Sequence, residues 1–106
     1  MKRLEFEVPD MNDSFSKVVI EEKEYLLRFT WNDTEQRWYF GIYTVLREPI
    51  LQGLKLVPKF PLTLQYVDDR LPNGILGVYT KEVVVGRQDF KNKRAVFAYI
   101  PNGEGS

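Results

Sequence analysis

Residues 23–46 read KEYLLRFTWNDTEQRWYFGIYTVL and carry the clearest strand pattern in the chain. The first third of this stretch alternates apolar with mostly polar residues, which is the period-two signature of a strand with one buried face. The apolar face of that strand comprises Tyr25, Leu27, Phe29 and Trp31. Residues 32–36 are polar and turn-prone, so they predict a hairpin loop. The chain then returns in a second strand over residues 37–46.

This second strand is apolar on both faces. One face carries Trp38, Phe40 and Ile42, and the other carries Tyr39, Tyr43 and Val45. A single small sheet has only one core side to fill, so the second face is free for another role. Tyrosine is favoured at protein interfaces because it buries a large ring and keeps a hydroxyl for a partner. We therefore predict a partner interface at Tyr39, Tyr43 and Val45, with both tyrosines partly exposed.

Outward from this hairpin, short period-two segments continue in both directions. They predict strands at residues 4–8, 15–20, 50–57, 75–80, 82–85 and 95–100. Gly53 lies inside one of them and indicates a bulge or a tight bend. Residues 62–67 fit either a strand or a single helical turn. No stretch of ten or more residues has helical periodicity.

These segments predict an all-β fold, a small single-domain β-sandwich or partly open β-barrel of short antiparallel strands. A length of 106 residues suits one domain. We assign residues 1–101 to that β domain and residues 102–106 to a flexible C-terminal tail. Residues 68–74 and 86–93 are expected to be loops.

The composition argues against an enzyme. The chain has no cysteine and no histidine, so it cannot form a disulfide, a thiolate metal site or a Ser-His-Asp triad. Asp68 and Asp69 are the only adjacent aspartates and could bind a metal or perform acid–base chemistry. Neighbouring residues on a strand point to opposite faces, and no calcium-loop spacing surrounds this pair, so we interpret it as a solvated turn. We expect no catalytic residue, no cofactor and no metal.

The charges are balanced overall but not along the chain. Fifteen basic and fifteen acidic residues give a formal net charge of zero, which makes nucleic acid an unlikely partner. Residues 1–53 have a balance of −3 and residues 54–106 a balance of +3, so copies could dock head to tail. No run of about 18 apolar residues indicates a membrane span.

A loop near the C-terminus concentrates basic side chains. Its four cations are Arg87, Lys91, Lys93 and Arg94. This candidate basic loop could touch DNA or an acidic partner surface, although an ordinary solvated loop is the simpler interpretation.

The richest aromatic cluster consists of Trp31, Trp38, Tyr39, Phe40 and Tyr43. Exposed rings stack on sugars and bases, so one alternative function is a free-standing β-barrel module that binds glycan or single-stranded nucleic acid. A domain of this size needs most of these rings for its core, which favours packing over ligand binding. A small enzyme that uses Asp68 or Asp69 is a third, weaker alternative.

Four ordered segments resemble a known protein family. They are residues 25–32, 37–43, 49–57 and 71–78, and together they span residues 25–78, about half of the chain. Their order and loop lengths are similar to those of the small baseplate plug proteins of contractile-tailed phages, related to a cyanophage baseplate plug. Residues 81–106 carry no motif that contributes to the resemblance.

The resemblance implies a non-catalytic virion protein of the tail baseplate, made in the host bacterial cytoplasm. It implies a role in plugging or bridging the junction between the tail tube and the baseplate hub. The implied partners are hub and tail-tube proteins, with self-association possible in the assembly. Such proteins supply no catalytic residues to transfer. Under this resemblance, Trp38 and Ile42 are core residues, and Gly53 and Gly74 are required by backbone geometry.

Overall fold

A computed structural model of the chain describes residues 4–58, 70–72 and 74–101. All regular elements of these residues are β-strands. They are β1 (Leu4–Phe6), β2 (Asp13–Ile20), β3 (Lys23–Asn32), β4 (Arg37–Tyr43), β5 (Pro49–Lys55), β6 (Ile75–Thr80) and β7 (Ala95–Ile100). No helix of the described residues is long and apolar enough to cross a membrane.

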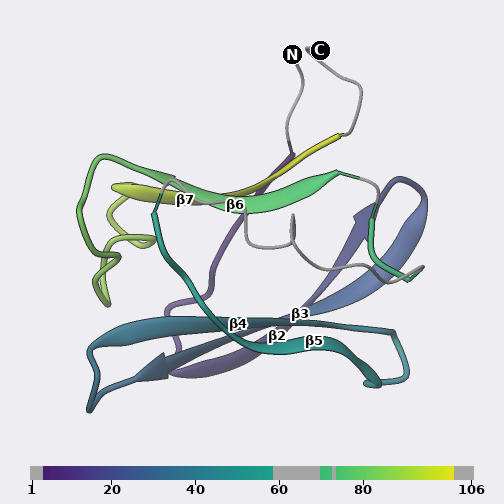
Figure 1. The fold of residues 1–106 in the computed structure, drawn as a ribbon, viewed down its shortest axis with the longest axis horizontal. Helices are drawn as coiled ribbons and strands as arrows, with labels where there is room; N and C mark the ends of the chain where they lie inside the picture. The colour runs from purple at the N-terminus through teal and green to yellow at the C-terminus, as the bar shows by residue number, and fades with distance from the viewer. Residues whose placement is uncertain (1–3, 59–69, 73, 102–106) are drawn as a thin grey trace.

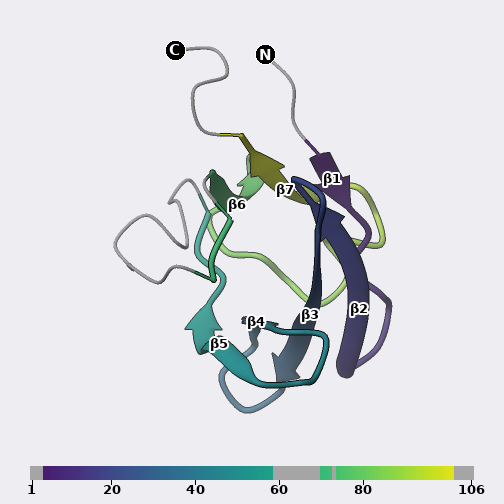
Figure 2. The same ribbon diagram turned by 90° about the vertical axis from the view of Figure 1, so that its right-hand side faces the viewer.

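The strands form two antiparallel sheets that face each other. One sheet has the order β1-β7-β6 and the other has the order β2-β3-β4-β5. Figure 1 shows the three-stranded sheet above the four-stranded sheet, and Figure 2 shows β2 and β5 at opposite edges of the latter. The predicted all-β class of short antiparallel strands is confirmed, and the two sheets do not close into a barrel.

Among the described residues, the hairpin of β2 and β3 has the longest continuous register. Its register runs without a shift from the pair Asp13–Thr30 to the pair Ile20–Lys23. Only Glu21 and Glu22 connect the strands, with φ of 51° and 70°. Two successive residues with positive φ make the type I′ turn, whose twist matches that of the strands it joins.

The core lies between the sheets and is strongly aromatic. Its largest fully buried side chains are Trp38, Tyr99, Phe29, Phe40 and Phe97. Phe97 of β7 meets Phe29 of β3 edge-on, with ring centroids 5.0 Å apart. The predicted core positions Trp38 and Ile42 are 1% and 0% exposed, so both are confirmed.

The predicted glycine roles also hold. The φ of Gly53 is 71°, and the β4–β5 pairing beside it shows register shifts, so the expected bulge is present. A Cβ on Gly74 would overlap the carbonyl oxygen of Ile100 and the ring of Tyr99. The amide of Gly74 donates a 2.7 Å hydrogen bond to the hydroxyl of Tyr99, which requires this close approach.

One predicted strand is absent and several predicted bounds differ: β1, β2 and β5 cover residues 4–6, 13–20 and 49–55, where the sequence predicted 4–8, 15–20 and 50–57. Residues 82–85 do not form a strand; residues 81–84 are bends, and Val83 is 90% exposed. Period-two reasoning failed because only Val85 of this apolar run reaches the core. β4 ends at Tyr43 rather than at residue 46, because the hydroxyl of Thr44 accepts hydrogen bonds from the amides of Leu46 and Glu48 and turns the chain. The predictions for residues 62–67 and for the tail at 102–106 lie outside the described residues.

Candidate interaction face

The four-stranded sheet turns one side away from the three-stranded sheet, and we call this side the outer face. Strand register places its side chains in rows across the sheet. One row contains Phe15, Arg28 and Gly41, and the next contains Asp13, Thr30, Tyr39 and Lys55. The sequence alternation predicted this division, because Trp38, Phe40 and Ile42 all point to the core side.

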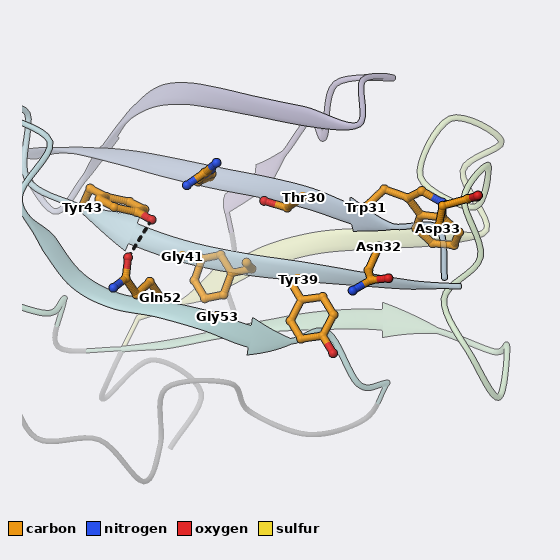
Figure 3. Close-up of a pocket in the computed structure, with 11 residues that line it drawn as sticks. Thr30, Trp31, Asn32, Asp33, Tyr39, Gly41, Tyr43, Gln52 and Gly53 are labelled. Atoms are coloured by element: carbon orange, nitrogen blue, oxygen red, sulfur yellow. Dashed lines mark hydrogen bonds between the residues drawn. The ribbon is translucent and has the colours of Figure 1, made fainter. Parts of the chain in front are cut away.

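A hollow of about 630 Å³ opens in the middle of the outer face. Gly41 contributes no side chain to its floor, and the ring of Tyr43 folds back over this position. Figure 3 shows Tyr43 and Gln52 at one end of the hollow, and Tyr39 and Asn32 toward the other. The hollow therefore combines aromatic rings with neutral hydrogen-bonding groups and with the charged side chains of Arg28 and Asp33, a mixture that suits a protein partner.

Tyr43 is less accessible than the sequence predicts. It is only 6% exposed, so the expectation of a partly exposed ring is wrong. The ring of Phe15 packs edge-on against it at 5.3 Å, and its hydroxyl donates a 3.2 Å hydrogen bond to Gln52 Oε1. Phe15 belongs to β2, which lies two strands away from β4 in the sheet, so alternation within one strand cannot reveal that Tyr43 is covered.

Arg28 organises the edge of the hollow. Its guanidinium donates two hydrogen bonds to the carboxylate of Asp13, at 2.9 and 2.7 Å, and lies 5.3 Å from the centre of the Phe15 ring. The hydrogen bonds from Arg28 hold the pKa of the Asp13 carboxyl below its usual value. The guanidinium of Arg47 lies 4.8 Å from the centre of the same Phe15 ring, so this ring contacts two cations.

Tyr39 is the predicted interface residue that remains accessible within the strand. It is half-buried, and its hydroxyl donates a hydrogen bond to Glu35 Oε1 in the β3–β4 hairpin. This bond raises the pKa of the Tyr39 hydroxyl. The ammonium group of Lys55 lies 6.0 Å from the ring. Tyr39 is thus presented in a fixed orientation rather than left free.

Val45 lies beyond the end of β4, in the turn between β4 and β5. Val45 and Leu46 are both exposed, and Leu46 is 78% exposed. The structure therefore separates the three predicted interface residues: Tyr39 lies on the outer face, Tyr43 beneath it, and Val45 at the tip of an adjoining turn. Whether they contact a partner stays a prediction.

Sequence reasoning did not select Phe15, Arg28 or Gly41 for this face. A signal was present, because a two-residue turn at residues 21–22 sets the β2–β3 register and places Phe15 opposite Arg28. The hollow itself required knowledge of how Tyr43 folds over Gly41, which no one-strand pattern contains.

Three of the four cations of the candidate basic loop form ion pairs with acidic residues of the same chain. Arg87 donates a 2.7 Å hydrogen bond to Asp10 Oδ1, and Lys91 lies 3.3 Å from Asp10 Oδ2. Arg94 lies 3.9 Å from the mostly buried carboxylate of Asp89. Lys93 alone of the four has no ion-pair partner among the described residues. The structure therefore does not gather these four cations into one free patch.

The aromatic cluster is mostly packed. Trp38 and Phe40 are buried between the sheets, and Trp31 meets the Trp38 ring edge-on at 5.5 Å. Tyr43 is covered as described above, which leaves Trp31 and Tyr39 as the two half-buried rings of the five. Stacking along a sugar or nucleotide chain uses several open rings, so this arrangement does not favour it.

The residues 4–58, 70–72 and 74–101 hold no group of three or more acidic, histidine or cysteine side chains that could bind a metal ion. Asp68 and Asp69 lie outside the described residues, so the interpretation of this pair as a solvated turn stays a prediction.

Comparison with known proteins identifies the family. A model of the family described as the cyanophage baseplate Pam3 plug gp18 matches residues 1–102. The chain belongs to this family. It is therefore a structural component of a phage baseplate. The match includes residues 81–102, which carried none of the motifs behind the resemblance in the sequence. A search of curated proteins gives no match.

Proposed function

We propose that this chain is a non-catalytic plug that fills or bridges the junction between the tail tube and the baseplate hub. The observation that carries the proposal is membership of the baseplate plug family over residues 1–102. A plug must resist displacement, and the sandwich supports that task with a continuous aromatic core between its sheets. Hub and tail-tube proteins are the proposed partners, and host cytoplasm the proposed place of synthesis.

The outer face of the four-stranded sheet is the proposed contact surface. Tyr39 is oriented by Glu35, and the neighbouring hollow offers uncharged donors and acceptors from Asn32 and Gln52. Val45 extends the surface at the adjoining turn. A tyrosine beside a hollow suits a hot spot, because an inserted partner side chain would be shielded from water.

The test uses assembled tails. The double variant Tyr39→Glu with Val45→Glu should fold but be absent from purified particles, because two new carboxylates would face the partner. Val83→Glu is the matched control, since Val83 is exposed on a loop of the other sheet. Normal incorporation of the double variant would show that another surface makes the contact. Assembly of intact, infectious tails without this chain would contradict the plug function itself.

A further inference from the structure

β2 is an unprotected sheet edge. Three of the four edges in the two sheets are blunted: β1 has three residues, β6 has Gly77 in its interior, and β5 begins at Pro49 and bulges at Gly53. β2 has eight residues, no proline, no glycine and no register shift. Proteins normally shorten, bend or cover such an edge, because its unpaired backbone groups accept another strand.

The alternation of hydrogen-bonded pairs between β2 and β3 identifies the backbone groups of β2 that point away from the sheet. The amide of Trp31 donates a 2.8 Å bond to the carbonyl oxygen of Asn12, so the pair Asn12–Trp31 is hydrogen-bonded. Bonded and non-bonded pairs alternate along an antiparallel ladder. The even-numbered residues of β2 therefore bond to β3. The amide and carbonyl groups of Phe15, Lys17 and Val19 point away from the sheet.

The side chains of these three residues also favour a strand partner. They share the outer face, where Phe15 is 36% exposed and Val19 is 57% exposed. Lys17 lies between them, and its ammonium group is 3.1 Å from Glu24 of β3. Lysine on an edge strand often discourages pairing, but here the ion pair draws it across the sheet, away from the edge.

We propose that β2 accepts an extended segment of a neighbouring baseplate protein as a fifth strand of the four-stranded sheet. The inference rests on the proposed function, which supplies such neighbours. The segment that fits has an acidic residue opposite Lys17, with apolar residues two positions away on each side, opposite Phe15 and Val19. Opposite charges and apolar pairs facing one another across strands are the stabilising combinations.

A second copy of this chain fits the edge less well. Two copies would join their β2 edges as antiparallel strands related by a two-fold axis perpendicular to the sheet. Because the odd-numbered residues carry the outward-pointing backbone groups, an odd-numbered residue of one copy would lie opposite an odd-numbered residue of the other. Of the two longest overlaps, one sets Lys17 against Lys17, which is a repulsive pair. The other sets Lys17 against Phe15 and leaves no acid opposite the lysine. A foreign strand can supply that acid.

The test compares two substitutions at one position. Lys17→Pro removes an amide that points outward and makes no bond to β3, so an edge strand tolerates it. Lys17→Ala removes the same side chain and keeps the amide. In tails assembled with each variant, we expect Lys17→Ala to lower incorporation only a few-fold, because it loses the pair with the acid of the partner strand. We expect Lys17→Pro to lower incorporation at least tenfold further, because it also removes the outward-pointing amide. Equal incorporation of both variants would overturn the proposal.

Amide hydrogen exchange supplies a measurement that needs no variant. In the isolated wild-type protein, the amides of Phe15, Lys17 and Val19 should exchange rapidly, and in purified tails they should become protected at least tenfold. Unchanged exchange in tails that contain the chain would overturn the strand addition and leave the plug function intact. Tails that lack the wild-type chain would instead contradict the plug function. A dimer of the isolated protein that Lys17→Pro dissociates would overturn the choice of a foreign strand.

Discussion

The indole Nε1–H of Trp38 donates a 3.1 Å hydrogen bond to the carbonyl oxygen of Gly86. Trp38 lies on β4, and Gly86 lies in the segment that links β6 to β7, so this bond joins the two sheets. The ring of Phe90 packs edge-on against the Trp38 indole, with ring centroids 5.8 Å apart. The guanidinium of Arg87 lies 5.3 Å from the centre of the Trp38 ring. The indole therefore anchors the whole 86–94 loop as well as the core.

Removing this indole should destabilise the fold severely. Trp38→Ala deletes a fully buried ring and should lower the free energy of unfolding by about 3–5 kcal/mol. Trp38→Phe keeps most of the apolar contact, loses the bond to Gly86 and should cost less than Trp38→Ala. Urea unfolding followed by circular dichroism measures both. A Trp38→Ala protein with an unchanged midpoint would contradict the anchoring role.

The sequence predicted the strands better than the surfaces between them. Alternation located Trp38 and Ile42 in the core, because each depends only on the strand to which it belongs. The burial of Tyr43 depends on Phe15 from β2, which lies two strands away in the sheet. The ion pairs of the candidate basic loop were missed for the same reason, since Asp10 is 77 residues from Arg87 in the chain. Strand patterns carry no information on such long-range contacts.

Gly41 and Gly53 should respond differently to alanine. A Cβ on Gly41 would lie 2.9 Å from Tyr43 Cε1 and 3.1 Å from the carbonyl oxygen of Leu51, so Tyr43 must move. Gly41→Ala should cost about 1–3 kcal/mol and disturb the hollow. A Cβ on Gly53 would meet no other atom within 4 Å, so Gly53→Ala should lower the stability only because alanine disfavours positive φ, by about 1 kcal/mol. Chemical denaturation measures both costs, and tyrosine fluorescence or NMR shifts of Tyr43 report its displacement. An unmoved Tyr43 in Gly41→Ala would contradict the packing described.

Asp10 should make the stability of the protein depend on pH. Hydrogen bonds from Arg87, and then from Lys91, hold the pKa of its carboxyl below the ordinary value of 3.8. A carboxyl with a lowered folded pKa stabilises the fold above its ordinary pKa, and this stabilisation is lost as pH falls through the lowered value. Asp10→Asn should therefore be less stable than wild type at pH 7, and the difference should shrink as the pH falls below the ordinary pKa of 3.8.

The control for this pH series is Glu82→Gln, which removes an exposed carboxylate with no ion pair among the described residues. Thermal unfolding of the three proteins between pH 2 and pH 7 measures the effect. A constant difference between wild type and Asp10→Asn across this range would show that the ionised carboxylate is not responsible.

Ser14 should be replaceable with a gain in stability. Its hydroxyl oxygen is buried, with no hydrogen-bond partner among the described residues. Burying an unpaired hydroxyl costs about 1–3 kcal/mol, so Ser14→Ala should raise the free energy of unfolding by about 1 kcal/mol. Ser16→Ala, at the next inward-facing and only half-buried position, should be nearly neutral. Loss of stability in Ser14→Ala would show that the hydroxyl has a partner, such as an ordered water.

Substitutions in the β2–β3 turn should distinguish the cost of backbone strain from the contribution of a side-chain hydrogen bond. Glu21 and Glu22 both adopt positive φ, which costs free energy for any residue except glycine. Glu22→Gly relieves this cost of about 1–2 kcal/mol, and glycine's larger loss of backbone entropy offsets about half of it, so the protein should gain about 0.5–1 kcal/mol of stability. Glu21→Gly relieves it too, but deletes the carboxylate that accepts a hydrogen bond from the Tyr99 hydroxyl on the opposite sheet. Because Tyr99 is fully buried, Glu21→Gly should be destabilising on balance.

A double-mutant cycle with Tyr99→Phe tests the cause of that difference. Phenylalanine at position 99 has no hydroxyl, so the carboxylate of Glu21 has no bond to lose in this background. Glu21→Gly should then become stabilising, by about the same 0.5–1 kcal/mol that we expect for Glu22→Gly. The midpoints of urea unfolding for the four proteins of the cycle give the coupling free energy. If Glu21→Gly destabilises the Tyr99→Phe protein as much as wild type, the bond between Glu21 and Tyr99 does not hold the turn against the three-stranded sheet.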